Sequence, residues 1–226
     1  MDKKAKGISG IKKRNRYDTS TLIEAQFEPG SRGRVLKNLL GIKSRQEMDR
    51  VEEQEQIRAL NELIKIYDQK HCFTAGDVCR IHKVWLGPVY PWAGQYRQVN
   101  LIKGDFPFAA TRQVPQLMDG LEKGLLKEFT PCNFTSQEKV IKALAVVHTE
   151  LVLIHPFRDG NGRVARLLSI LMGLQAGLPP LDFGGIKGQK RKEYFAAVQA
   201  GLERDYQPME KVFSAVVCKA LQVREG

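Results

Sequence analysis

Most of the chemistry in this sequence lies in one stretch, HPFRDGNGRVAR, at residues 155–166. His155 carries an imidazole whose usual pKa, about 6.5, suits a general base at neutral pH. Asp159 supplies a hard carboxylate oxygen of the kind that binds Mg²⁺ together with nucleotide phosphates. Arg163 and Arg166 place two guanidinium groups on one helical face, where both can pair with a phosphate. A lone histidine or aspartate in a loop is usually structural, but this order of residue types predicts a phosphate-binding site.

The residues between the carboxylate and the arginines are small. Gly160, Asn161 and Gly162 allow backbone conformations with positive φ, so their amides can converge on phosphate oxygens. Apolar segments at 143–154 and 164–174 flank the stretch and predict a loop held between two core helices. The second helix starts at the loop, and a helix N-terminus favours anions. The residues alone therefore predict a Mg²⁺-dependent enzyme that moves a phosphate-containing group to a hydroxyl.

Helical spacing of apolar residues accounts for most of the remaining chain. The predicted helices cover residues 44–69, 74–85, 112–128, 135–154, 161–177, 189–203 and 209–223. Three of them open with a capping-box pattern: Ser44 with Glu47, Thr74 with Asp77, and Thr135 with Glu138. A β pattern is convincing only at Asn100 to Phe108, where Lys103-Gly104-Asp105 suits a tight hairpin turn. The expected fold is one all-α domain with a small β-hairpin.

Charge is concentrated at the N-terminus. The chain has 226 residues and a net charge of +11, and residues 1–16 carry seven basic residues against one acidic residue. We interpret residues 1–16 as a basic flexible tail and residues 17–226 as the folded domain with its N- and C-terminal helical extensions. Such a tail can bind nucleic acid, but no DNA- or RNA-binding signature follows it, so nucleic acid is not an expected partner.

Composition also limits the cellular context. No apolar run approaches the ~20 residues that a membrane helix needs, and no apolar stretch follows the basic N-terminus. The four cysteines are scattered, without a C-x-x-C pair. We therefore expect a cytoplasmic protein with reduced thiols and no membrane partner.

The motif resembles the signature of the Fic family, H-P-F-x-[DE]-G-N-G-R-x-x-R, at every specified position of residues 155–166. The resemblance extends upstream to domains of the cell-filamentation type and covers about residues 17–210. The matching upstream stretches are Val35-Leu36-Lys37-Asn38, Leu40-Gly41-Ile42, Ile81-His82, Tyr90-Pro91-Trp92-Ala93-Gly94 and Arg97. The resemblance implies a Fic-fold helical bundle with a hairpin flap.

The activity implied by the resemblance is protein adenylylation. Members of the family transfer AMP from ATP and Mg²⁺ to a Tyr, Thr or Ser hydroxyl of a target protein and release pyrophosphate. On this resemblance, His155 deprotonates the incoming hydroxyl, and Asp159 binds Mg²⁺ between the α- and β-phosphates.

The resemblance also implies how the rest of the site holds the nucleotide. The amides of residues 160–162 hold phosphates, Asn161 contacts the α-phosphate, and Arg163 and Arg166 grip the β- and γ-phosphates. Tyr194 matches a position at which the family often has a tyrosine near adenine, although a lone helical tyrosine is as often a core residue. Phe157 is expected to anchor the loop in the core.

The hairpin at Asn100 to Phe108 corresponds to the family's flap, whose edge pairs with an extended segment of the target. Lys103, Gly104, Asp105 and Phe106 are then expected to lie against the nucleotide and the target side chain. The hairpin sequence alone favours an ordinary surface hairpin.

Many Fic proteins are inhibited by a helix with the pattern [ST]-x-x-x-E-[GN]. Ser20 and Glu24 match its first part, but Ala25 replaces the Gly or Asn. One hypothesis is that Glu24 reaches Arg166 and blocks the γ-phosphate; the alternative is a chance match. If it is chance, an antitoxin-like inhibitor protein is the other expected means of control.

Two further interpretations compete with adenylylation. Relatives of the Fic family transfer UMP or phosphate, and the phosphorylating Doc-type relatives have Lys where this chain has Gly162, which favours AMP transfer. The second alternative is a catalytically silent module that binds nucleic acid through the basic tail. The presence of His155 and Asp159 argues against it.

Overall fold

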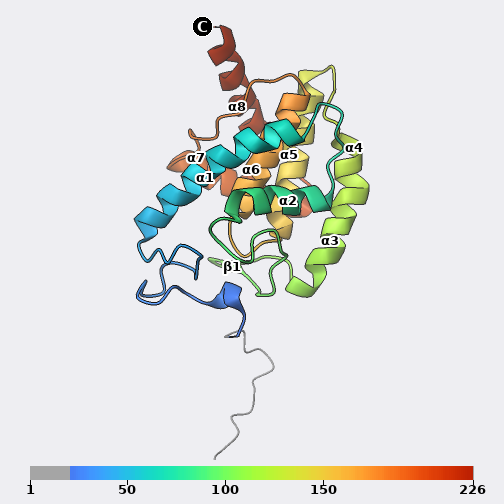
Figure 1. Ribbon diagram of the computed structural model, residues 1–226. Helices are drawn as coiled ribbons and strands as arrows, with labels where there is room; N and C mark the ends of the chain where they lie inside the picture. The colour runs from blue at the N-terminus through green and yellow to red at the C-terminus, as the bar shows by residue number, and fades with distance from the viewer. Residues whose placement is uncertain (1–20, 226) are drawn as a thin grey trace, which may run out of the picture.

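The computed structural model describes residues 21–225, and the predicted tail at 1–16 and Ser20 lie outside the described residues (Figure 1). Helices form almost all of the regular structure. They are α1 (Arg45–Ile66), α2 (Ala75–Leu86), α3 (Val114–Leu121), α4 (Lys127–Phe129), α5 (Gln137–Ile154), α6 (Asn161–Gln175), α7 (Gln189–Ala200) and α8 (Gln207–Glu225). The two strands are β1 (Ile102–Lys103) and β2 (Phe106–Pro107). The expected all-α fold with a small hairpin is confirmed.

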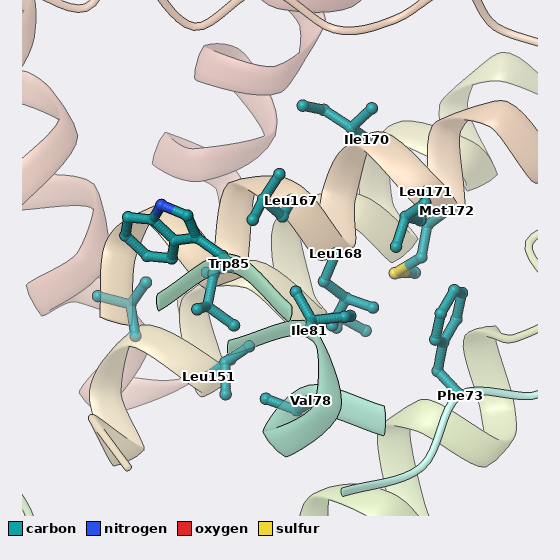
Figure 2. Packing of buried hydrophobic residues seen from close by; sticks show 14 of the residues in the cluster. Phe73, Val78, Ile81, Trp85, Leu151, Leu167, Leu168, Ile170, Leu171 and Met172 are labelled. Carbon is teal, nitrogen blue, oxygen red and sulfur yellow. The ribbon is translucent and has the colours of Figure 1, made fainter. Parts of the chain in front are cut away.

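The core is built around α5 and α6. Five consecutive residues of α5, from Ala143 to Val147, are buried, so neighbours surround this helix on every side. The helix packs against α6 on one side and α8 on another, while α1 and α2 pack against each other in front of α6 (Figure 1). Side chains of α2 such as Ile81 and Trp85 meet Leu167 and Leu168 of α6 (Figure 2). Because α5 and α6 are the most enclosed helices, the loop between them has rigid supports at both ends.

The capping predictions had mixed outcomes. At α2 the full capping box forms, since the Thr74 side chain accepts from the Asp77 amide and the Asp77 side chain accepts from the Thr74 amide. At α1 the Ser44 side chain accepts from the Glu47 amide at 3.4 Å. The prediction for α5 was wrong by one residue, because its N-cap is Ser136 and this side chain makes no capping hydrogen bond.

The predicted continuous helix over 112–128 is wrong in detail. A 3-10 turn (η2, Thr111–Gln113) comes before α3, and a π-helical turn (η3, Glu122–Leu126) separates α3 from α4. Leu121 and Leu126 are both buried, although a five-residue spacing puts them on different faces of a regular helix. The wider π turn brings them onto one face, and Gly124 within it weakens the preference for α-helix.

The hairpin is short and lies at the end of the bundle away from the C-terminal end of α8 (Figure 1). Its strands are antiparallel, with Ile102 opposite Pro107 and Lys103 opposite Phe106. Gly104 adopts a left-handed conformation at the turn, with φ 59°. Within residues 21–225, no helix combines the length and apolar character required to cross a membrane.

Candidate active site

The loop from His155 to Gly160 connects α5 to α6 through two left-handed residues. His155 ends α5 with φ 53°, and its amide donates to the Leu151 carbonyl at 3.1 Å. Gly160 precedes α6 with φ 82°, and a Cβ at this position would lie 2.7 Å from the Trp85 ring. Both the conformation and the close indole therefore require glycine here. Gly162, by contrast, is an ordinary helical residue of α6, so only the first of the two glycines uses positive φ.

Asn161 fixes the middle of this loop. Its Oδ1 accepts from the Phe157 amide, and its Nδ2 donates to the Phe157 carbonyl, both at 2.8 Å. The Phe157 ring is fully buried, which confirms its role as a core anchor, and it stacks on His82 with centroids 3.9 Å apart. The Asn161 amide is thus committed to the loop in this structure, although the residue lines the adjacent cavity.

His82 supports the loop from α2. Its Nδ1 accepts from the Gly94 amide at 2.7 Å, which requires the proton to sit on Nε2. That Nε2–H donates to the Asp159 carbonyl at 3.2 Å. Burial lowers the pKa of His82 to about 4, so the neutral tautomer persists through neutral pH. The upstream YPWAG stretch and the motif are therefore connected through this one imidazole.

His155 has one free ring nitrogen. Its Nδ1 lies 3.0 Å from the Val152 carbonyl, an acceptor, so Nδ1 carries the proton and Nε2 has a lone pair. The ring stacks on Phe108, just beyond β2, at a centroid distance of 3.6 Å. Burial lowers its pKa to about 4, with smaller lowering from Arg97 and Lys103 and opposing contributions from the Val152 carbonyl and Asp159. At neutral pH this imidazole is neutral and can accept a proton at Nε2.

A cavity of about 860 Å³ opens beside the loop. It brings together predicted residues from three parts of the chain: His155, Asp159, Gly160, Asn161, Gly162, Arg163 and Arg166 from the motif, Lys103, Gly104 and Phe106 from the hairpin, and Tyr194 from α7. Asp105 does not line it. Residues that the sequence did not single out complete the walls, among them Phe108, Arg191 and Phe195. The cavity is thus enclosed by the loop, the hairpin and α7.

Asp159 is placed at the anion-binding end of α6. Its Oδ1 accepts from the Gly160 amide at 2.6 Å and lies 3.6 Å from Nη2 of Arg163. Among the described residues no group of three or more His, Cys, Asp or Glu could hold a metal ion. Mg²⁺ usually binds one or two carboxylates and takes its other ligands from phosphates and water. A single, part-exposed carboxylate beside phosphate-binding groups fits a Mg²⁺ ion that arrives with a nucleotide.

The two motif arginines have different surroundings. Arg163 pairs through Nη1 with Oε2 of Glu52, a fully buried carboxylate of α1. Glu52 also accepts from the Tyr90 hydroxyl at 2.7 Å, and the Arg163 guanidinium lies 4.6 Å from the Trp85 ring centre. Arg163 is therefore tied to α1 and α2, with its Nη2 turned toward Asp159.

Arg166 has no carboxylate partner within the described chain, and its buried Nε lacks an acceptor there. Its guanidinium lies against the ring of Tyr194. Burial raises the pKa of Tyr194 above its usual value, and Arg166 only partly offsets this rise. The Tyr194 hydroxyl lies 2.8 Å from Nε2 of His148, and Nδ1 of His148 faces the Ser169 hydroxyl, which itself donates to the Ala165 carbonyl. Nδ1 must then carry the proton, so Tyr194 donates to Nε2 and offers its oxygen to Arg166. Arg166 is thus oriented, and its Nε is an unsatisfied donor.

The hairpin side of the cavity adds more positive charge. Lys103 places Nζ 3.5 Å from the Phe195 ring centre on α7. Burial lowers its pKa, and the nearby Arg191 and Arg166 lower it further. Three cations from three elements therefore converge on one wall of the cavity, an arrangement that favours a polyanionic ligand.

The proposed contact between Glu24 and Arg166 is not formed. Glu24 lies in a 3-10 turn (η1, Ile23–Ala25), where its Oε1 accepts from the Gln98 amide at 2.6 Å. Its carbonyl accepts from Nε of Arg158 at 2.8 Å. The carboxylate is buried against the segment that leads into the hairpin. This placement corrects the prediction, because a carboxylate that satisfies a buried amide there does not reach Arg166.

Fold and site together define an α-helical domain with a cavity between a helix N-terminus and a hairpin, lined by several cationic side chains. Residues 72–172 match the model of the Fic/DOC family, so the chain contains a Fic domain. The chain is 30% identical over 165 residues to Protein adenylyltransferase Fic from Nematostella vectensis, covering 69% of this chain and 36% of that protein. It spans about a third of the length of the curated relatives that it matches.

Solved structures support the fold. The N-terminal Fic domain of a VirB-translocated effector from Bartonella sp. AR 15-3 superposes with a TM-score of 0.68 at 21% identity, covering 87% of this chain and 92% of that one. The BepC protein of Bartonella tribocorum, solved with bound AMPPNP, superposes with a TM-score of 0.64 at 24% identity, covering 80% of this chain and 91% of that one.

Sequence reasoning missed several residues that support the site. Glu52 carried no signal, because an acidic residue in an amphipathic helix looks like surface. His148 and Phe108 were also passed over, one inside an apolar helix and the other at the end of the hairpin. In the structure Glu52 is buried four residues after Met48, on the apolar face of α1.

Proposed function

We propose that this protein is a protein adenylyltransferase, a nucleotidyltransferase that moves AMP from ATP to a Tyr, Thr or Ser hydroxyl of a target protein. The observation that carries the proposal is that His155, whose Nδ1 is used by the Val152 carbonyl, lines a cavity together with cationic and helix-terminal groups. The relatives named protein adenylyltransferase support it.

His155 acts as the general base in this reaction. The target hydroxyl oxygen attacks the α-phosphorus of ATP, a new P–O bond forms, and the bond between the α-phosphorus and the bridging oxygen breaks. The hydroxyl proton passes to Nε2 of His155, and pyrophosphate leaves. A base with a pKa of about 4 is weaker than the ideal for neutral pH. The negative phosphates of bound ATP raise the pKa of this imidazole toward the working range.

The phosphates are held by the first turn of α6 and by Arg166. Asn161 and Gly162, which open α6, line the cavity, and the helix dipole favours negative charge there. A Cβ on Gly162 would meet no heavy atom within 4 Å, so neither packing nor backbone requires glycine at this position. Its lack of a side chain instead leaves room for a phosphate. The unsatisfied Nε of Arg166 gains an acceptor when the triphosphate binds.

Asp159 is the residue that would hold a Mg²⁺ ion accompanying the nucleotide. Such an ion would supply positive charge to offset the charge of the phosphates. The Gly160 amide and Arg163 keep the Asp159 carboxylate pointed toward the cavity.

The nucleoside end fits the part of the cavity lined by Ile186, which offers apolar contact to a base. Phe195 and Tyr194 of α7 also line the cavity, with Lys103 and Arg166 against their rings. A cavity of about 860 Å³ is in the usual range for sites of this type. The related BepC protein holds AMPPNP, an ATP analogue. Together these features favour ATP as the donor.

The target protein docks on the flap, the hairpin from Asn100 to Phe108. Its strands are only two residues long, and Ile102 is 71% exposed, so an edge is available for an added strand. A target segment paired with this strand passes close to Phe108 and to His155, the general base on which Phe108 stacks.

Labelled ATP tests the proposal. The protein is incubated with a cell lysate, Mg²⁺ and ATP labelled at either the α- or the γ-phosphate. Protein labelling from the α-position alone is the expected result. Labelling from the γ-position would instead indicate phosphorylation, and no labelling from either would overturn transferase activity. Replacing ATP by α-labelled UTP separates AMP from UMP transfer.

A further inference from the structure

Arg97 is a buried arginine whose hydrogen bonds join two parts of the site. Only 2% of its surface is exposed, and it follows the YPWAG stretch. Its Nε donates to the His155 carbonyl at 2.7 Å, and its backbone amide donates to the Pro156 carbonyl at 2.9 Å. Both acceptors belong to the catalytic loop, so Arg97 contacts the residue that carries the base.

The remaining donors of Arg97 reach both ends of the flap. Nη1 donates to the Val99 carbonyl at 3.0 Å, and Nη2 donates to the Ala109 carbonyl at 2.5 Å. Val99 precedes the first strand and Ala109 follows the second. A guanidinium is a rigid planar fork of five donors, which can satisfy carbonyls in several fixed directions at once. The ammonium of lysine cannot reproduce this geometry.

The surroundings of Arg97 show why a charge is tolerated there. All of its side-chain acceptors are neutral carbonyls, and burial lowers its pKa. Glu24 opposes that lowering, and its Oε1 accepts from the amide of Gln98, the residue next to Arg97. An apolar residue would fill this space without the desolvation cost of a cation. The arginine is therefore best explained by its hydrogen bonds, which connect the loop at His155 to the two ends of the flap.

We propose that Arg97 is a positioning residue that joins the catalytic loop and the flap into one rigid unit. A target docked on the flap then meets His155 in a fixed register, a consequence that rests on the proposed function. The same bond from Nε supports His155 in its left-handed conformation, which is unfavourable for a residue other than glycine. Arg97 touches neither nucleotide nor target in this arrangement.

Charge and geometry can be separated by two substitutions. Arg97→Lys keeps the positive charge but loses the fork, and Arg97→Gln loses both. The groups that act on the His155 imidazole are Arg97 and Lys103, which lower its pKa, and Asp159 and the Val152 carbonyl, which raise it. Removing the charge therefore raises the pKa of His155, while the lysine variant leaves it near its original value. This effect follows the charge alone, so it separates the charge of Arg97 from the geometry of its hydrogen bonds.

The test compares both variants with Arg112→Gln, which changes an exposed arginine near the flap, outside the cavity wall. Hydrogen exchange is followed at the Phe108 amide, which donates to the Leu101 carbonyl within the flap. We expect this amide to exchange at least tenfold faster in both Arg97 variants, and at the wild-type rate in Arg112→Gln. Label transfer from α-labelled ATP should fall about 10- to 100-fold in both, because a small misplacement of reacting groups is costly. The acid limb of the pH–rate profile should move to higher pH only in Arg97→Gln.

The results overturn the proposal if both Arg97 variants keep the wild-type flap exchange and the NMR shifts of the His155 ring. If neither variant folds, the wild-type protein still decides. In the wild-type protein, the Phe108 and Arg97 amides should exchange with similar protection, because one opening event exposes both. A Phe108 amide that exchanges over 100-fold faster than the Arg97 amide would refute the rigid unit. A wild-type protein that transfers no label contradicts the proposed function alone, since the exchange and NMR measurements need no activity.

Discussion

The catalytic loop and the flap face each other across the same cavity, but they are held in different ways. Within the loop, the Phe157 backbone is bonded to Asn161, and His82 holds the Asp159 carbonyl. The flap has two short strands and a turn at Gly104, where an added Cβ would meet nothing within 4 Å. Arg97 fastens its two ends, and its Lys103 and Phe108 side chains contact Phe195 and His155 across the cavity.

This difference separates two tasks. A base must be held within a few tenths of an ångström of its working position, which packing and hydrogen bonds in the loop achieve. A docking edge has to accept a partner's backbone, and the short two-stranded ladder leaves edge groups available for pairing while Arg97 keeps both ends of the flap in place. The predictions below break first the chemistry, then the support of the loop, then the contact between the two regions, and finally the flap surface.

Replacing His155 should have the largest effect on activity. In His155→Ala the general base is lost, and we expect label transfer from α-labelled ATP to fall about 10²- to 10⁴-fold. The control is His71→Ala, which removes an imidazole that pairs with Asp77 and does not line the cavity, and it should leave transfer unchanged. Transfer by His155→Ala within threefold of the wild-type rate would contradict the assignment of the base.

Breaking the loop clamp should lower both stability and activity. Asn161→Ala leaves the buried amide and carbonyl of Phe157 without partners, at a cost of about 1–3 kcal/mol each. We expect the free energy of unfolding, measured in urea, to fall by about 2–4 kcal/mol. Asn133→Ala, at an exposed loop position, should change it by less than about 0.5 kcal/mol. Equal stability of the two variants would show that the loop is held by something else.

The contact between loop and flap should be visible in the pH dependence. Burial under Phe108 keeps the pKa of His155 near 4, below its ordinary value of about 6.5. Activity that needs neutral His155 is lost as pH falls through this pKa. In Phe108→Ala water reaches the ring, so the pKa rises and the acid limb of kcat/KM moves to higher pH, by about one unit.

Phe106→Ala is the matched control, since Phe106 meets the edge of Phe108 and has no ring contact with the imidazole. Its acid limb should keep the wild-type midpoint even if KM changes. An unchanged midpoint in Phe108→Ala would mean that the flap does not shield the base.

The sequence predicted the parts of this site that are close together in the chain. The relative positions of residues 155–166 are largely set by their own sequence, because a short loop between two buried helices can adopt few conformations. Most helices followed from apolar spacing, and the π turn failed that rule because it exists to bring Leu121 and Leu126 onto one face. The hairpin was placed correctly, although its ladder is shorter than the extended pattern suggested.

The residues missed by the sequence are those whose partners are far away. Glu52 lies 111 positions from Arg163, and no local pattern connects them. Glu24 shows the opposite error, since a local motif match suggested Arg166 as a partner and the fold supplied the Gln98 amide instead. Charged residues can satisfy several different partners, and tertiary packing decides between them. An apolar stripe on a helix predicts a single outcome, burial of that face, so it is easier to interpret than the position of a charged residue.

Altering the exposed edge of the flap should have the smallest effect and should be confined to docking. Ile102 is 71% exposed, so Ile102→Asp removes little buried area and should leave the free energy of unfolding within about 0.5 kcal/mol of the wild type. If a target segment pairs with this strand, a charge at its face should raise KM for the target about two- to fivefold, comparable to a lost surface contact. KM for ATP should change less than KM for the target, although Ile102 lines the cavity, and kcat should be unchanged because the hydrogen bonds that hold the loop do not involve Ile102. The same substitution at Leu117, an exposed leucine of α3 away from the cavity, controls for a general effect of added charge. A rise in KM for ATP with no change for the target would indicate that the flap serves the nucleotide alone.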